Sequence, residues 1–320
     1  MRYIEERLRE LEAYRPELTR RPDFGEFWEN TLSESHDREL RPTAKQVDYP
    51  CGHARVYDIS YDGFDGTRIH GWFLVPAFGK AGRWPCLIQY HGFTDSRGLP
   101  WQLMHWVMAG MAVLAVDCRA QGGVTGNCAH YTDSGMVANV TTLGILDPHE
   151  YYYRAVYMDC VRAVDFAAGR PEVDPGRIAV RGTSQGGALG MAVCALGGRP
   201  ALGIVNVPSN SDIETRIAGR HGSFSAAADF LMRYPDQTDR VLETLSYFDT
   251  MNMADRIRCP IFASVALGDQ VCPAKCYYAS YNRITAPKEI TVYPFNGHDG
   301  AGDAHMEREL GYLRESGFLA

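Results

Sequence analysis

The stretch that decides the fold is RIAVRGTSQGGALGMAVCAL, residues 177–196. It starts as a short apolar run, turns through Gly-Thr-Ser-Gln-Gly and continues as helix-forming residues. A G-x-S-x-G turn between a strand and a helix is typical of a nucleophile elbow, whose strained backbone presents the serine hydroxyl. Side chains at Gly182 and Gly186 would meet the strand and the helix, so glycine is expected at both. The alternative is a plain Gly/Ser loop, which the flanking strand and helix disfavour. Ser184 is the candidate nucleophile.

Five further short apolar runs alternate with helical segments along the chain. They cover residues 86–90, 112–116, 204–207, 261–266 and 289–293. Buried runs that alternate with helices predict βαβ units and a mostly parallel sheet. Upstream, VYDISYDGFDGTRIHGWFLVP predicts a hairpin, which we expect to begin an antiparallel edge of that sheet. The sequence therefore predicts an α/β-hydrolase fold, a central sheet flanked by helices, with its active site at the carboxyl ends of the strands.

Three segments fall outside this alternation. Residues 1–45 are charged and helix-periodic, and we expect them to form an N-terminal helical extension of a single domain over 1–320. Residues 208–255 are a helical insertion between two strands, long enough to cover a site as a cap. Residues 122–150 are a Gly-rich polar segment.

The bulk composition restricts the classes of partner. The 320 residues are 45% hydrophobic and 22% charged, with a formal net charge of -7. No long basic run marks a nucleic-acid or anionic membrane surface, and no stretch approaches the roughly 18 apolar residues of a membrane span. The N-terminal MRYIEERLRELEAY lacks the apolar core of a signal peptide. We expect a cytoplasmic protein with a neutral or modestly polar small substrate.

Nine cysteines are present, an odd number for a disulfide framework. Cys86, Cys160, Cys194 and Cys259 lie in apolar patterns and are interpreted as reduced, buried thiols. One further pair, residues 272 and 276, lies four apart with no second pair at zinc spacing and no neighbouring His. We therefore expect no metal and no cofactor.

A serine nucleophile needs a base within hydrogen-bond reach and a group that orients the base. In the predicted fold the chain order is Ser, acid, His. Asp269 follows a buried strand in IFASVALGDQVCP, and His298 follows the next one in VYPFNGHDG. Ser184, Asp269 and His298 therefore form the predicted catalytic triad.

Other candidates for base and acid are weaker. His91 precedes the serine in the chain, His221 lies in the insertion, and His305 falls in the terminal helical pattern as a surface or packing residue. Asp255 precedes its strand, so it would lie at the opposite edge of the sheet.

The oxyanion of a tetrahedral intermediate needs two donors. One is expected to be the backbone N–H of Gln185, and the other an N–H from the loop LIQYHGFTDSRG. We select Phe93, after His91 and Gly92; the alternative is that this loop is only a turn.

A polar cluster, Asp-Cys-Arg-Ala-Gln-Gly, follows the strand at 112–116. Arg119 and Gln121 in this cluster can link loops by hydrogen bonds. We interpret them as structural support for the site, with direct substrate contact as the alternative.

With these residues in place, the chain resembles the acetyl xylan esterase and cephalosporin C deacetylase family, carbohydrate esterase family seven. The segments that carry the resemblance are YHGF, DCRAQGG, GILDPHEYYYRAVYMDCVRAV, GTSQGG, LSYFDTMN, LGDQVCP and PKEITVYPFNGHDG. The resemblance implies the same triad and oxyanion donors, a homohexamer that encloses its active sites, and deacetylation of O-acetylated xylo-oligosaccharides and other small acetate esters, cephalosporin C among them.

The chain departs from this family at three positions. It has Ala120 where the family usually has Gly, Phe93 where it has Tyr, and Asp299 where it has Glu. The oxyanion donor at residue 93 is a backbone N–H, which the change from Tyr to Phe preserves. We therefore expect the departures to affect substrate preference and not the hydrolytic residues. The resemblance places Phe93 beside the acyl group, and with Tyr90 and Trp101 nearby in sequence we expect a small, rigid acyl slot. The open alternatives are a general short-chain carboxylesterase without sugar preference and a peptidase, which the lack of propeller-like repeats disfavours.

Overall fold

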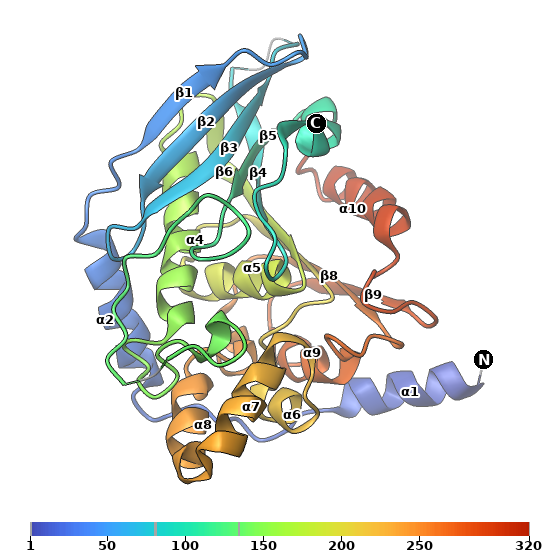
Figure 1. The fold of residues 1–320 in the computed structure, drawn as a ribbon. Coiled ribbons are helices and arrows are strands. Elements are labelled where there is room, and N and C mark those ends of the chain that lie inside the picture. Colours follow the sequence, from blue (N-terminus) through green and yellow to red (C-terminus); the bar gives the residue numbers. More distant parts are fainter. Residues whose placement is uncertain (1, 80–81, 134, 320) are drawn as a thin grey trace.

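The computed structural model describes residues 2–79, 82–133 and 135–319, and these form one nine-stranded sheet with helices on both faces (Figure 1). The strand order is β1-β2-β3-β5-β4-β6-β7-β8-β9. Neighbours from β5 to β9 run parallel, whereas β1, β2 and β3 pair antiparallel. The prediction of an α/β fold with a mostly parallel central sheet is confirmed. The strands are β1 (Thr43–Val47), β2 (Ala54–Asp62), β3 (Arg68–Pro76), β4 (Trp84–Tyr90), β5 (Ala112–Val116), β6 (Val173–Thr183), β7 (Leu202–Asn206), β8 (Ile261–Ala266) and β9 (Lys288–Tyr293).

The antiparallel edge begins earlier than expected. We predicted helix through residue 45 and an edge beginning with the hairpin at residue 56. Instead, Thr43–Val47 form β1, which pairs with β2 along its whole length. β1 is an edge strand with half-exposed and exposed side chains, so its five residues lack the apolar alternation that marks a buried strand.

The helices are α1 (Arg2–Ala13), α2 (Phe24–His36), α3 (Met104–Met108), α4 (Tyr152–Ala168), α5 (Gln185–Leu196), α6 (Ile213–Ala218), α7 (Ser225–Arg233), α8 (Thr238–Ser246), α9 (Ala274–Tyr281) and α10 (Gly302–Glu315). The segment between β7 and β8 contains α6, α7 and α8, which lie together at one end of the molecule (Figure 1). That segment is the helical insertion expected from the sequence.

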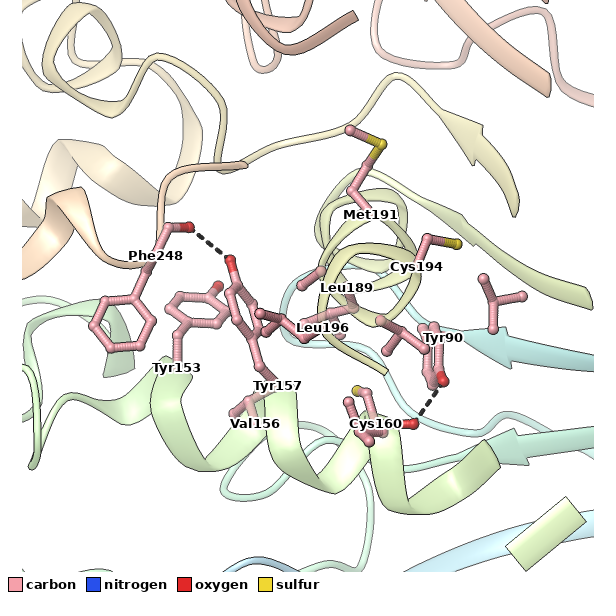
Figure 2. Packing of buried hydrophobic residues seen from close by; sticks show 14 of the residues in the cluster. Tyr90, Tyr153, Val156, Tyr157, Cys160, Leu189, Met191, Cys194, Leu196 and Phe248 are labelled. Atoms are coloured by element: carbon pink, nitrogen blue, oxygen red, sulfur yellow. Dashed lines mark hydrogen bonds between the residues drawn. The ribbon is translucent and has the colours of Figure 1, made fainter. Parts of the chain in front are cut away.

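Apolar side chains bury both faces of the sheet. Successive residues of a strand point to opposite faces, so Leu87 of β4 belongs to the core cluster that includes side chains of α3 and α10, and Ile88 belongs to the cluster that includes side chains of α2, α4, α5 and α9. Figure 2 shows α4 and α5 packed against each other, with buried tyrosines between them. The Tyr157 hydroxyl donates to the Phe248 carbonyl oxygen at 2.8 Å, which satisfies its polar atom inside the core (Figure 2). This packing fixes α5, and with it the turn that precedes the helix.

All nine cysteines are free thiols, and six of them are buried. Cys86, Cys160 and Cys194 are buried as expected, whereas Cys259 is only partly buried because it lies in the turn before β8.

Candidate active site

Ser184 lies in the turn between β6 and α5, with φ 60° and ψ −119°. A serine with positive φ is strained, and such strain persists only where the surroundings hold it. The Ser184 N–H donates to the Asn206 carbonyl oxygen at 2.9 Å, and its own carbonyl oxygen accepts the Ser209 N–H at 3.0 Å. The end of β7 and the segment after it therefore hold the strained turn in place.

The two glycines of the motif are required by close approach of the backbone. A Cβ at Gly182 would lie 2.1 Å from the carbonyl carbon of Gly186. A Cβ at Gly186 would lie 2.1 Å from the carbonyl oxygen of Tyr90. Both contacts are with backbone, which cannot move aside as a flexible side chain would. These clashes confirm the prediction that side chains at the two positions would meet the strand and the helix.

Ser184, His298 and Asp269 form a continuous hydrogen-bonded chain. His298 Nε2 lies 3.0 Å from Ser184 Oγ, and His298 Nδ1 lies 2.8 Å from Asp269 Oδ2. The Asp269 side chain has no solvent exposure, and its Oδ1 accepts the N–H groups of Val271 and Cys272, both at 2.8 Å. Because an ionised carboxylate only accepts hydrogen bonds, Nδ1 of the imidazole is the donor and Nε2 is left to accept the serine proton.

The alternative residues have other partners. His305 is buried, with Nε2 2.9 Å from Asn206 Oδ1, and burial lowers the pKa of its imidazole. His221 Nδ1 lies 2.9 Å from the Gln270 carbonyl oxygen. Asp255 forms an ion pair at 2.6 Å with an arginine of the N-terminal segment. His305 is thus a packing residue, one of the two roles expected for it from the sequence.

The loop after β4 carries the predicted oxyanion donor at Phe93. His91 anchors this loop: its Nε2 accepts the Cys118 N–H at 2.8 Å, and its Nδ1 lies 2.7 Å from the Gly92 carbonyl oxygen. Burial lowers the pKa of His91, which keeps the imidazole neutral as these bonds require. The Phe93 N–H has no acceptor among the described residues. The Gln185 N–H opens α5 and has no acceptor within the helix.

A pocket of about 630 Å³ lies over Ser184. Its lining combines the triad serine and histidine, both oxyanion candidates and residues of the insertion, so the insertion does border the site. The lining residues are Gly92, Phe93, Asp95, Asn139, Thr183, Ser184, Gln185, Ser209, Arg216, Gly222, Ser223, Val271, Cys272 and His298.

The expected acyl slot is only partly correct. Phe93 lines the pocket, but the Tyr90 hydroxyl donates to the Cys160 carbonyl oxygen inside the core (Figure 2). Trp101 is 62% exposed on the surface. Tyr90 points to the face of the sheet covered by α4, and Trp101 lies on a turn before α3, so nearness in sequence to Phe93 did not bring either residue to the pocket.

A family model described as acetyl xylan esterase matches residues 1–316. The chain belongs to the acetyl xylan esterase family. The resemblance drawn from the sequence is thereby confirmed, and this membership indicates a carboxylic ester hydrolase.

Individual relatives agree with this family. The structure of an acetyl xylan esterase from Paenibacillus sp. R4 is 41% identical, with a TM-score of 0.91 over 95% of this chain and 99% of that one. Acetyl xylan esterase 1 from Thermoanaerobacterium sp. JW/SL YS485 is 29% identical, with a TM-score of 0.88 over 95% of this chain and 98% of that one. Acetyl esterase Axe7A from Xylanibacter ruminicola is 28% identical over 302 residues, which are 89% of this chain and 66% of that protein. The chain thus spans about two thirds of that relative.

Gln121 connects the residues that carry the two oxyanion candidates in this family member. Its Oε1 accepts the Thr94 N–H at 2.8 Å, directly after Phe93. Its Nε2 donates to Gln185 Oε1 at 2.9 Å and to the Tyr152 hydroxyl at 2.9 Å. The amide therefore fixes the loop after β4 against the start of α5. Its interpretation as support for the site agrees with these contacts, since Gln121 is not among the pocket-lining residues.

Arg119 is buried and holds two loops together. Its guanidinium pairs with Asp159 of α4 at 2.7 Å and with Asp65 of the β2–β3 turn at 2.6 Å. Burial acts to raise the pKa of Asp65, but the hydrogen bonds and charge of Arg119 outweigh it and lower that pKa to about 2. Arg119 thus supports the segment that carries Gln121 and does not reach the pocket.

Two of the three departures from the family, Ala120 and Asp299, affect the structure of loops. Ala120 has φ 53°, in the left-handed region that glycine adopts freely and that costs an L-residue about 1–2 kcal/mol. Asp299 shapes the loop around His298: its carboxylate accepts the N–H of Gly297 at 2.9 Å and that of Ala301 at 3.1 Å. Asp299 therefore braces the loop that carries His298.

Three residues of the site were not singled out from the sequence. The Tyr153 hydroxyl donates to Gln185 Oε1 at 2.9 Å, Cys272 Sγ lies 3.8 Å from Ser184 Oγ, and Arg216 reaches the pocket from α6. No motif marks Tyr153 or Arg216, because their position depends on how α4 and the insertion pack. Cys272 could have been found from its place three residues after Asp269.

Over the described ranges, His, Cys, Asp and Glu do not gather in any group of three or more that could hold a metal ion. In the same ranges the helices are too short or too polar to cross a membrane.

Proposed function

We propose that the chain is a serine esterase that removes acetyl groups from small acetate esters, O-acetylated xylo-oligosaccharides among them, through an acetyl-enzyme intermediate. The observation that carries the proposal is the hydrogen-bonded chain from Ser184 Oγ through His298 to the buried carboxylate of Asp269. This arrangement supplies a nucleophile, a base and a group that orients the base.

In the first half-reaction, Ser184 Oγ attacks the ester carbonyl carbon while His298 Nε2 accepts the serine proton. The carbonyl oxygen becomes an oxyanion, which the N–H groups of Phe93 and Gln185 stabilise. The intermediate collapses as the bond to the alcohol oxygen breaks, and His298 returns the proton to that oxygen. The products of this step are the free alcohol and acetyl-Ser184.

In the second half-reaction, water attacks acetyl-Ser184 and His298 accepts a proton from it. The bond between the acyl carbon and Ser184 Oγ then breaks, the proton passes to that oxygen, and acetate leaves. Throughout both steps Asp269 remains ionised, orients the imidazole and stabilises its charged form.

The pocket supports a small polar alcohol component. Its volume of about 630 Å³ falls in the range for small-molecule sites. Asn139, Ser209 and Ser223 add polar groups to the lining, which suits the hydroxyls of a sugar.

Substrate preference is tested with a panel of 4-nitrophenyl acetate, acetylated xylo-oligosaccharides, cephalosporin C and a peptide amide, each assayed with the wild type and Ser184→Ala. We expect the wild type to hydrolyse all three ester classes, the acetylated sugar with a higher kcat/KM than 4-nitrophenyl acetate, and to leave the amide intact. Sugar esters no faster than 4-nitrophenyl acetate would support a general short-chain carboxylesterase instead. Cleavage of the amide at a comparable rate would contradict the proposal.

We also propose a homohexamer, on the family resemblance alone. Light scattering is then expected to give about six times the chain mass of 35.7 kDa. A monomer at micromolar concentration would remove the enclosed chamber and open the site to polymeric xylan.

A further inference from the structure

The insertion contributes a buried cation to the pocket. Arg216, on α6, lines the pocket and is only 1% exposed. Its Nη2 donates to the Val271 carbonyl oxygen at 3.0 Å and approaches Cys272 Sγ at 3.7 Å. Its Nε and Nη1 are buried with no hydrogen-bond partner among the described residues. Two of the three guanidinium nitrogens thus lack an acceptor.

Within the described part of the chain, Arg216 forms no ion pair with an acidic side chain, and the buried Asp269 contacts the same loop only through the N–H groups of Val271 and Cys272. The nearby Asp212 accepts the Tyr14 hydroxyl at 2.8 Å, and Asp249 accepts the N–H groups of Asp212 and Ile213. Neither forms an ion pair with Arg216, which otherwise lies 5.5 Å from the centroid of the Phe224 ring. A buried charge without a counter-charge is costly, and such charges are normally paired. The guanidinium is therefore arranged for an anion that the chain itself does not supply.

The guanidinium lies close to the reacting atoms. Cys272 Sγ is 3.7 Å from Arg216 Nη2 and 3.8 Å from Ser184 Oγ, so one thiol separates the cation from the nucleophile. Another charged residue of the lining, Asp95, follows the oxyanion loop, is exposed to solvent and accepts the Ser96 N–H. Its charge is screened by water, whereas that of the buried Arg216 is not.

We propose that Arg216 binds a carboxylate of the substrate, so that the preferred substrates are acetate esters of molecules that also carry a carboxylate, such as acetylated hydroxy acids and acidic sugars. The inference rests on the proposed esterase function. A carboxylate can accept two parallel N–H bonds from a guanidinium, which would fill the vacant donors of Arg216. One carboxylate also matches the single charge of this guanidinium, whereas a phosphate dianion would be left half neutralised.

A purely structural role for Arg216 makes a different prediction. Its bond to the Val271 carbonyl oxygen could serve only to hold the loop that positions Asp269. Loss of such support would slow every ester equally, whereas loss of anion binding slows the anionic ester alone.

The test compares 4-acetoxybenzoate with its neutral counterpart 4-acetoxybenzamide, using the ratio of their kcat/KM values. In Arg216→Met we expect this anionic-to-neutral ratio to fall at least about tenfold from the wild type. The matched control is Arg220→Gln, which removes an exposed charge of the same segment, paired with Asp229, and should leave the ratio unchanged. An unchanged ratio in Arg216→Met, whether both rates persist or both fall equally, would overturn the proposal.

A second measurement needs no variant and decides the matter if Arg216→Met fails to fold. With 4-nitrophenyl acetate as substrate of the wild type, benzoate is expected to inhibit competitively at least about tenfold more strongly than benzamide. Equal inhibition by the two would also overturn the proposal. If the wild type hydrolyses none of these esters, the esterase function itself fails, which is a distinguishable outcome.

Discussion

The buried acid of the triad allows a sharp test, because Asp269→Asn changes one atom of the side chain and almost nothing of its shape. In the wild type, Oδ1 accepts two backbone N–H groups and Oδ2 accepts the imidazole N–H of His298. An asparagine can keep the two backbone bonds only by placing its oxygen there, which turns its NH₂ toward the imidazole. His298 Nδ1 must then accept, so its proton moves to Nε2, which can no longer accept the proton of Ser184.

Asp269→Asn should therefore fold normally but lose about 10³- to 10⁴-fold in kcat, or about 4–5 kcal/mol of transition-state stabilisation. The assay is initial-rate hydrolysis of 4-nitrophenyl acetate, with the melting temperature as a check on folding. Asp255→Asn is the matched control, since that carboxylate forms a partly exposed ion pair away from the pocket, and its kcat should stay near wild type. A folded Asp269→Asn within about tenfold of wild-type kcat would refute the role assigned to the acid.

Three further predictions concern acyl size, the oxyanion loop and pH. Along a series of 4-nitrophenyl esters, kcat/KM should fall at least about tenfold from acetate to butyrate. Cys272 closes the space beside the nucleophile, so added methylenes must displace packed atoms. Equal or rising rates along the series would mean an open acyl site. Gln121→Ala should lower kcat about tenfold with little change in KM. The substitution frees the loop of Phe93 from the start of α5 and removes no contact with substrate. An effect confined to KM would point to direct contact between Gln121 and substrate. Burial lowers the pKa of His305 in the folded state, so the unfolded chain binds the proton more tightly. The free energy of unfolding should therefore decrease as pH falls from 7 to 5, by at most about 1.4 kcal/mol per pH unit for this group. Urea titrations should give a flatter pH dependence in His305→Gln, and an unchanged slope would remove His305 as a cause.

The sequence predicted the structure best where backbone geometry and catalytic chemistry allow few alternative arrangements. The runs at residues 112–116 and 261–266 match β5 and β8 because strands buried on both faces must be continuously apolar. The positions of Ser184, Asp269 and His298 at strand ends followed from the order of elements, and the structure brings the three within hydrogen-bond distance.

The sequence was least informative where position depends on packing between distant segments. The edge strand β1 has no buried face to impose a pattern on Thr43–Val47. Tyr90 and Trp101 are close to Phe93 in sequence, yet one points into the core and the other to solvent. Arg216 reaches the pocket only because α6 packs beside the loop after β8, and no local motif encodes that contact.

The central claim is that Ser184 performs nucleophilic catalysis, and kcat for Ser184→Ala with 4-nitrophenyl acetate tests it most directly. The side chain is small, and among the described residues its hydroxyl makes no hydrogen bond beyond that to His298 and the weak contact with Cys272, so the variant should fold and keep its melting temperature. We predict a loss of at least about a thousandfold in kcat. A folded Ser184→Ala protein that hydrolyses the ester at the wild-type rate would contradict it.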